Sequence, residues 1–330
     1  MRFLAFLALC CLSVLAQAQT LPQAPTIAAK SWLLLDYSTG QALASYNPDD
    51  RVEPASLTKL MTAYVVLGAL KEGRLKPDQA LPVSERAWKT PGSRMFIEPR
   101  KPVTVDELLR GMIVQSGNDA CIALAEAVAG SEEAFAQMMN REAQRLGLKA
   151  TRFANATGLS DPQHYSTARD LGALAAALIR DYPEHYPLYA LREYTYNRIT
   201  QANRNRLLWL DPAVDGVKTG HTENAGYCLV ASAKRGPRRL LSVVMGAASD
   251  GMRTQESQKL LNFGFQFFDS VKLYGKDQEV SRLRVWKGAQ NTVRAGFLED
   301  FTLSLPKGMA ENLKASLVSR QPLLAPVSQG

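Results

Sequence analysis

The segment Pro54-Ala55-Ser56-Leu57-Thr58-Lys59 opens the stretch that decides the fold. Proline suits the first turn of a helix, because its fixed φ is helical and the N–H that it lacks has no partner there. Apolar and small residues fill most positions from Ala55 to about Leu70, which predicts a helix buried on most sides. Ser56 and Lys59 are three residues apart and would share one face of this helix. The segment therefore predicts a hydroxyl and an amine held side by side.

A second short motif, Ser116-Gly117-Asn118, lies between two predicted helices. Thr104 and Glu107 fit a capping box that begins a helix running to Val114. A helical pattern resumes from Asp119 to Val128, so the motif is expected on a tight corner. A plain helix-to-helix turn would have the same residues, so this motif is weak evidence when taken alone.

A third motif, Lys218-Thr219-Gly220, leads into two strong predicted strands, 226–233 and 240–245. A buried strand at 31–36 with a hairpin after it is predicted near the start of the chain, and a long amphipathic helix at 255–268 follows the late strands. Helices grouped between β segments at both ends predict an α/β (α+β) fold in which helices flank a central antiparallel sheet.

The composition changes beyond about residue 272, where short alternating runs separated by glycine and proline turns predict a small all-β domain. Those runs are 282–286, 292–296 and 301–305. We expect a catalytic domain at 19–272 and a β domain at 273–330. Because so few strands would leave unpaired edges, we also expect that the chain is cut short after Gly330.

The first residues have the order of a secretory signal peptide: the charged Met1-Arg2, an apolar run from Phe3 to Val14, and the small residues Ala16-Gln17-Ala18. Spanning a bilayer takes about 20 apolar residues, so we expect removal of residues 1–18 by cleavage after Ala18 rather than a retained anchor. The sequence thus predicts an exported protein.

Two cysteines, Cys121 and Cys228, remain after the predicted cleavage. A chain of this length can bury a hydrophobic core without disulfide bonds, so two free, buried thiols are expected. A disulfide bond between the two cysteines is the alternative. The formal charge of +8 falls to +7 without Arg2, which fits a basic soluble surface or attraction to an anionic envelope polymer or membrane surface. A nucleic-acid partner is not expected for an exported protein.

A serine–lysine pair of this spacing has a clear chemistry, in which Ser56 attacks a carbonyl and Lys59 takes its proton. Lysine acts as a base near neutral pH only when burial and a neighbouring positive charge lower its pKa, and Lys218 is the expected second charge. The helix N-terminus adds a field that favours the alkoxide of Ser56. No metal-ligand cluster, phosphate-binding glycine loop or dinucleotide fingerprint occurs in the sequence, so neither a metal nor a cofactor is expected.

The three motifs together resemble those of penicillin-binding serine acyltransferases. From about Ala28 to Gln321 the chain is similar to the low-molecular-mass (class C) penicillin-binding proteins of serine peptidase family S11, which are D-alanyl-D-alanine carboxypeptidases. The segments 113–121 and 215–222 carry the most specific similarity. This resemblance implies a transpeptidase-like, β-lactamase-like catalytic domain, a small β domain, and a C-terminal amphipathic helix at the outer face of the inner membrane. No such helix occurs in the sequence, which supports the expected truncation.

The resemblance also implies roles for individual residues. Ser116 would relay a proton to the leaving amine, and Asn118 would hold the substrate amide. Lys218 and Thr219 would grip the carboxylate end, and the backbone N–H groups of Ser56 and His221 would form the oxyanion hole. The further candidates are Arg253 as a carboxylate ligand, Arg204 as a weaker second one, the segment 86–98 as a rim loop or a plain surface loop, and His164 and His185 in structural or surface roles.

The favoured function is removal of the terminal D-alanine from a peptidoglycan stem pentapeptide in the periplasm, with β-lactams as covalent inhibitors and a role in cell-wall maturation and cell shape. One alternative is a class A β-lactamase, whose deacylating glutamate lies in an E-x-x-L-N pattern. Glu193 and Asn197 match that pattern only in part, because Tyr196 replaces its leucine and the stretch lies too near Lys218. The other alternative is a non-catalytic penicillin-binding envelope scaffold.

Overall fold

The computed structural model describes residues 22–313, 316, 318 and 322–327. The predicted signal peptide, its cleavage after Ala18 and the end of the chain at Gly330 lie outside these residues. No helix in the described part of the chain has the length and apolar character needed to cross a bilayer.

The centre of the larger domain is a five-stranded sheet with the order β2-β1-β9-β8-β7, in which all neighbouring strands are antiparallel. The fold predicted from the sequence is therefore correct in its central feature. Strand β7, which carries the third motif, is an edge strand of this sheet. The strand bounds are β1 Ser31–Asp36, β2 Ala42–Tyr46, β7 Val214–Thr222, β8 Gly226–Arg235 and β9 Arg238–Ala247.

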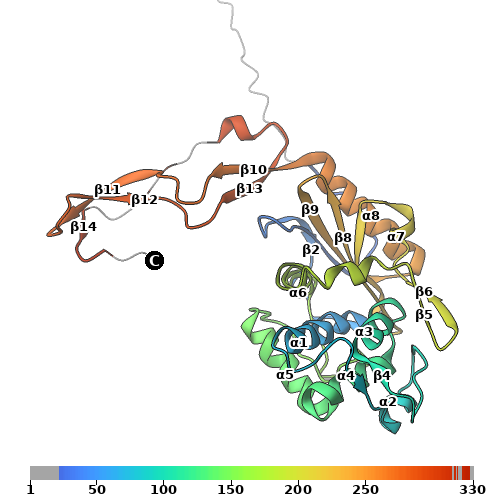
Figure 1. Ribbon diagram of the computed structural model, residues 1–330. Coiled ribbons are helices and arrows are strands. Elements are labelled where there is room, and N and C mark those ends of the chain that lie inside the picture. The colour runs from blue at the N-terminus through green and yellow to red at the C-terminus, as the bar shows by residue number, and fades with distance from the viewer. Residues whose placement is uncertain (1–21, 314–315, 317, 319–321, 328–330) are drawn as a thin grey trace, which may run out of the picture.

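Helices cover both faces of the sheet (Figure 1). Successive side chains of a strand point to opposite faces, so adjacent apolar residues of β1 enter different cores. Leu33 joins the larger core, shared with α6 (Ala168–Asp181), whereas Leu34 joins a smaller core under α8 (Asp250–Phe267). Gly264 of α8 lies so close to the sheet that an added Cβ would come within 2.9 Å of Leu34.

A lobe of helices stands beside the sheet and contains most of the larger core (Figure 1). Its central element is α1, in which ten of thirteen residues are buried. Side-chain caps fix the starts of two neighbours, at Thr104 with its predicted capping box and at Ser131. The bounds are η1 Ala55–Thr58, α1 Lys59–Lys71, α2 Glu85–Lys89, α3 Val105–Val114, α4 Asn118–Ala129 and α5 Glu132–Arg145.

The structure corrects three predicted boundaries. The first helix begins as a 3₁₀ turn, and its α-helical part starts only at Lys59. Helix α8 begins at Asp250 rather than Gln255, because the Ser249 hydroxyl accepts the N–H of Met252 and caps it there. The segment expected as a loop from Arg86 starts inside helix α2.

Short elements connect the larger ones around the domain. Two hairpin-like pairs and two single turns belong to this group, and the second pair lies close to helix α3. The bounds are β3 Ala80–Leu81 with β4 Val103–Thr104, η2 Tyr186–Ala190, β5 Glu193–Tyr196 with β6 Ile199–Ala202, and α7 Leu207–Leu210.

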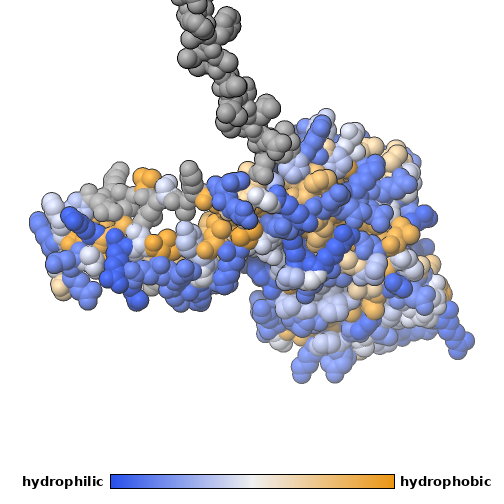
Figure 2. Space-filling model, turned by 90° about the horizontal axis from the view of Figure 1, so that it is seen from above, coloured by the Kyte–Doolittle hydropathy of each residue, from blue (hydrophilic) through white to orange (hydrophobic). Residues whose placement is uncertain are grey.

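A slender all-β arm follows α8 directly and extends away from the larger domain (Figure 1). Figure 2 shows this arm from above, attached at one end, with polar residues over most of the visible surface. The predicted boundary at residues 272 and 273 falls inside its first strand. The arm contains β10 Phe268–Tyr274 paired with β13 Phe301–Pro306, β11 Ser281–Trp286 between β12 Thr292–Ala295 and β14 Leu323–Leu324, and the turn η3 Ala310–Asn312.

The two cysteines of the described chain are free and buried, as the sequence favoured. Burial raises the pKa of Cys121 to about 11 and that of Cys228 to about 11, so both thiols stay protonated at neutral pH.

Candidate active site

The hydroxyl and the amine predicted to lie side by side do so. Lys59 Nζ lies 3.1 Å from Ser56 Oγ. The same nitrogen donates to Asn118 Oδ1 at 2.7 Å and to the carbonyl oxygen of Thr157 at 2.6 Å. Those two oxygens only accept hydrogen bonds, so both must receive an N–H from Lys59. In a neutral amine the remaining position is a lone pair, and the hydroxyl of Ser56 is the group that faces it.

The surroundings of Lys59 favour that neutral amine. The side chain is 2% exposed, and burial is the largest cause that lowers its pKa below the usual lysine value. The positive charge of Arg204 lowers this pKa further, while Cys121 and Asp119 oppose the change. Lys218, the second charge expected from the sequence, is not among these causes. Instead burial, followed by the charge of Lys59, lowers the pKa of Lys218 itself.

The second motif lies on the predicted corner, where α3 ends and α4 begins. Ser116 has a φ of 62°, an uncommon conformation for a serine, and its Oγ accepts a hydrogen bond from Lys218 Nζ at 3.0 Å. Lys218 also donates to the Thr219 carbonyl oxygen at 3.1 Å. The second and third motifs are therefore in direct contact, although 102 residues separate Ser116 from Lys218 in the chain.

Asn118 connects Lys59 to a loop at the rim of the site. Its Oδ1 accepts from Lys59, while its Nδ2 donates to the Pro91 carbonyl oxygen at 2.7 Å. The next residue, Asp119, is 1% exposed and accepts the backbone N–H groups of Met95, Phe96 and Ile97 at 2.9–3.2 Å. Together the two side chains hold the loop that follows α2, so part of the predicted segment 86–98 does border the site.

The third motif lies on edge strand β7, which packs against the turn that carries Ser56. Gly220 marks this contact, because a Cβ there would come within 3.0 Å of the Pro54 carbonyl oxygen. Ser56, Ser116 and Thr219 line one cleft, of about 440 Å³, together with His221 and Arg253. The eight residues first proposed for catalysis and substrate binding all lie at this cleft or bond to a residue that does, and Asn118 does so through its N–H to the Ser93 carbonyl oxygen. They are Ser56, Lys59, Ser116, Asn118, Lys218, Thr219, His221 and Arg253.

Two arginines bring positive charge to the cleft. Arg253 is 4% exposed and forms an ion pair with Asp250 at 2.5 Å. It also donates to the Gly220 carbonyl oxygen at 3.0 Å, so it supports strand β7 as well as lining the cleft. Arg204 is exposed and makes no hydrogen bond or ion pair with any described residue, which leaves its guanidinium free for an anionic ligand.

The loop around Thr157 also borders the site and was not predicted from the sequence. Its carbonyl oxygen accepts from Lys59, and the neighbouring Ala156 carbonyl oxygen accepts the Thr62 hydroxyl at 2.6 Å. Gly158 has a φ of 84°, and an added Cβ would overlap the Ala55 carbonyl. Only the Gly158-Leu159 turn signal marked this loop in the sequence, and a backbone acceptor leaves no trace in residue identity.

Two of the histidines contact neighbouring side chains near the site. The Nε2 atom of His164 lies 2.8 Å from Thr58 Oγ1, inside the first motif, which the sequence did not reveal. The His221 ring packs on Tyr227 with centroids 4.0 Å apart. Within the described residues no group of three or more His, Cys, Asp or Glu side chains is placed to hold a metal ion.

The residues that faintly match the β-lactamase pattern lie elsewhere. Glu193 begins strand β5, and Asn197 follows it in the turn, where its Nδ2 donates to Glu98 Oε1 at 2.7 Å. Neither residue bonds to Ser56 or Lys59.

This fold and the three motifs that meet at one cleft define a serine enzyme of the penicillin-binding class.

Comparison with known proteins narrows this class. The family model described as D-alanyl-D-alanine carboxypeptidase (peptidase S11) matches residues 18–249, and the model of the penicillin-binding protein 5 C-terminal domain matches residues 268–330. The chain is 47% identical to D-alanyl-D-alanine carboxypeptidase DacC of Escherichia coli, over 99% of this chain and 83% of that protein. It is 45% identical to DacA of Haemophilus influenzae, over 93% and 79% of the two chains.

Solved structures of penicillin-binding proteins are also similar to this chain. The crystal structure of penicillin-binding protein 5 from Haemophilus influenzae matches with a TM-score of 0.90 and 44% identity, over 93% of this chain and 91% of that chain. Penicillin-binding protein D2 from Listeria monocytogenes in its ampicillin-bound form matches with a TM-score of 0.68 and 31% identity, over 74% and 99%. The chain belongs to the D-alanyl-D-alanine carboxypeptidase family, and it is a serine-type carboxypeptidase that acts on peptidoglycan peptides.

Proposed function

We propose that Ser56 is the nucleophile of this carboxypeptidase and that neutral Lys59 is its base. Ser56 Oγ attacks the carbonyl carbon between the two terminal D-alanines while its proton passes to Lys59 Nζ. The observation that supports this most strongly is the bonding of Lys59, whose two N–H groups are taken by carbonyl oxygens, so that its lone pair faces Ser56. In this arrangement the base needs no reorientation before the attack.

The tetrahedral intermediate carries its negative charge on the former carbonyl oxygen. We place that oxygen against the backbone N–H groups of Ser56 and His221, which suit the role because preorganised donors cost no rearrangement as charge develops. The C–N bond then breaks, and the proton that Lys59 took from Ser56 passes through the hydroxyl of Ser116 to the departing D-alanine amine, which returns Lys59 to its neutral form. Lys218, which bonds to Ser116 Oγ, orients this relay. Oδ1 of Asn118 has a second lone pair for the amide N–H of the substrate.

Hydrolysis of the acyl-enzyme completes the cycle. Water attacks the Ser56 ester, Lys59 takes a proton from that water, and the Ser56 oxygen leaves and is protonated again. The carboxylate of the terminal D-alanine lies against Thr219 and the guanidinium groups of Arg204 and Arg253, because paired cationic donors suit a carboxylate.

β-Lactams are the expected covalent inhibitors, since they would acylate Ser56 and leave slowly. The similarity to an ampicillin-bound penicillin-binding protein supports this. The test is an assay of D-alanine release from diacetyl-L-lysyl-D-alanyl-D-alanine, with and without penicillin. Release that penicillin blocks supports the proposal; labelling without turnover favours a scaffold, and rapid penicillin hydrolysis favours a β-lactamase.

We also propose that the protein acts in the periplasm after export. A C-terminal amphipathic helix, where one follows this sequence, would make peripheral contact with the outer face of the inner membrane. For the domain division we propose a catalytic domain at 19–272 and a β domain after it. Strand β10 spans the join between them.

A further inference from the structure

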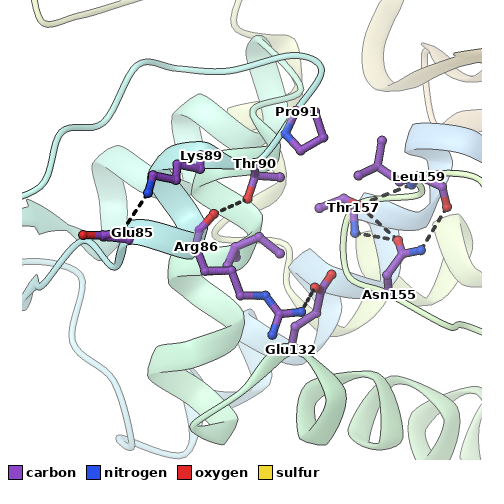
Figure 3. A pocket seen from close by; sticks show the side chains of 10 residues that line it. Glu85, Arg86, Lys89, Thr90, Pro91, Glu132, Asn155, Thr157 and Leu159 are labelled. Carbon is purple, nitrogen blue, oxygen red and sulfur yellow. Dashed lines mark hydrogen bonds and ion pairs between the residues drawn. The ribbon is translucent and has the colours of Figure 1, made fainter.

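A second cavity, of about 480 Å³, opens between helix α2 and the loop at 155–159 (Figure 3). Arg86 and Lys89 of α2 line one side, and Asn155, Thr157 and Leu159 line the other. None of the three motifs contributes a residue to it. The mechanism proposed above does not use this space.

The cavity nevertheless adjoins the catalytic cleft through two bonded residues. Thr157 lines the cavity, and its carbonyl oxygen accepts from Lys59. Pro91 also lines the cavity, and its carbonyl oxygen accepts from Asn118. Ser93, two residues further along the same loop, lines the catalytic cleft. Two residues span at most about 7 Å of chain, so the two hollows lie next to each other along this loop.

The direction of the substrate follows from the position of the arginines. Arg204 and Arg253 lie in the catalytic cleft and hold the terminal carboxylate, so the leaving D-alanine lies on their side of Ser56. The rest of the peptide extends from Ser56 in the opposite chain direction. It would run along the loops around Pro91 and Thr157, which bond to Asn118 and Lys59 and also line the second cavity.

The lining of this cavity carries charges of both signs. Glu132 is buried, and its Oε1 accepts the N–H of Ala156. Its Oε2 forms an ion pair with Arg86, which Figure 3 shows. Glu85 and Lys89 form a second pair at 2.8 Å, with side chains 77% and 63% exposed. Exposed pairs of this kind contribute little to stability, so a ligand with its own charges can exchange partners with them at small cost.

We propose that this cavity binds the charged residues that precede D-alanyl-D-alanine in the stem peptide, with a side-chain ammonium facing Glu85 and a carboxylate facing Lys89 and Arg86. The inference rests on the function proposed above. Binding in this cavity would make the enzyme selective for stem peptides that carry these charges over neutral peptides with the same D-alanyl-D-alanine end.

The test compares two peptides with the full chain. Diacetyl-L-lysyl-D-alanyl-D-alanine has no charge before its D-alanine pair, whereas L-alanyl-γ-D-glutamyl-L-lysyl-D-alanyl-D-alanine has ammonium groups and a carboxylate. D-Alanine release gives kcat/KM for each. Lys89→Glu is expected to lower the pentapeptide-to-tripeptide ratio of kcat/KM about fivefold, mainly through KM, because it replaces an attraction to the carboxylate with a repulsion.

The matched control is Lys101→Glu. Lys101 is 60% exposed, forms a similar pair with Glu98, and does not line the cavity, so its ratio is expected to equal that of the wild type. An unchanged ratio in Lys89→Glu, or an equal fall in Lys101→Glu, would overturn the subsite. If the wild type releases D-alanine from neither peptide, the proposed function itself fails, which is a separate result.

Discussion

The imidazole of His164 lies 2.8 Å from the hydroxyl oxygen of Thr58, the residue directly before Lys59 in the chain. Its other ring nitrogen, Nδ1, accepts the backbone N–H of Ala154 at 3.3 Å. The proton of the neutral ring is therefore on Nε2 and is donated to Thr58. This contact ties the 3₁₀ turn of Ser56 to the loop that supplies the Thr157 carbonyl.

Burial lowers the pKa of His164 from 6.5 to about 4, so the folded protein keeps the ring neutral. The unfolded chain takes up a proton as the pH falls below about 6.5, and the folded protein does not. The stability from this histidine is thus present above pH 6.5 and lost towards pH 4, and the gap between the two pKa values corresponds to about 3 kcal/mol. Urea unfolding at pH 7.5 and pH 4.5 should show a smaller difference in His164→Gln than in the wild type. An equal difference in both proteins would contradict this.

Ser56→Ala should abolish both covalent labelling by a fluorescent penicillin and D-alanine release, while the circular dichroism spectrum stays that of the wild type. Lys59→Ala should lower kcat by about 10³-fold or more, because the attacking hydroxyl loses its base. Gel fluorescence and a D-alanine assay measure the two effects. Retained label in Ser56→Ala would refute the nucleophile.

The pH dependence of kcat/KM should rise through the pKa of Lys59, since only the neutral amine accepts the Ser56 proton. Burial and then the charge of Arg204 lower this pKa below the usual lysine value. Arg204→Ala removes the charge and should move the rise to higher pH. If the rise stays in place or moves to lower pH, Arg204 has no such influence on Lys59.

Arg253→Ala should raise KM for peptides with a free terminal carboxylate, because one of the two guanidinium groups that face it is lost. A peptide ending in D-alanine amide lacks that carboxylate and serves as the comparison, so the fold-change in KM should be several times larger for the acid than for the amide. Equal changes for both peptides would assign Arg253 only to the support of strand β7 through its bond to Gly220.

Gly158→Ala should lower both activity and stability, since an added Cβ would overlap the Ala55 carbonyl and the φ of 84° disfavours any side chain. The displaced loop would move the Thr157 carbonyl away from Lys59. Gly147→Ala is the matched control, because Gly147 has a φ of 72° but open space around it. If both variants lose the same activity, backbone strain alone accounts for the effect.

The parts of this site that local spacing determines were predicted from the sequence. Ser56 and Lys59 share one turn, and the capping box at Thr104 leads directly to the corner at Ser116. The antiparallel order of β8 and β9 follows in the same way from two alternating strands joined by a short turn. Each of these needs only the periodicity of a helix or strand.

Contacts between segments far apart in the chain could not be predicted from the periodicity of single helices and strands. The Thr157 carbonyl meets Lys59 across 98 residues, and any residue type would supply the same oxygen. Lys218 was expected to lower the Lys59 pKa, but burial and the charge of Arg204 lower it instead, and both depend on the complete fold. The cap that starts α8 at Ser249 was overlooked because the apolar pattern begins later.

The join between the larger domain and the β arm is held by Arg238 of β9. Its guanidinium forms an ion pair with the fully buried Asp36 at 3.0 Å and donates to the carbonyl oxygens of Gly264 and Phe268. Asp36 in turn accepts the hydroxyl of Ser270 in the arm at 2.7 Å. Strand β10 follows α8 without an intervening loop, so a rotation of the arm about this join would break these bonds. We therefore expect the contacts of Arg238 and Asp36 to restrict how the arm turns relative to the cleft.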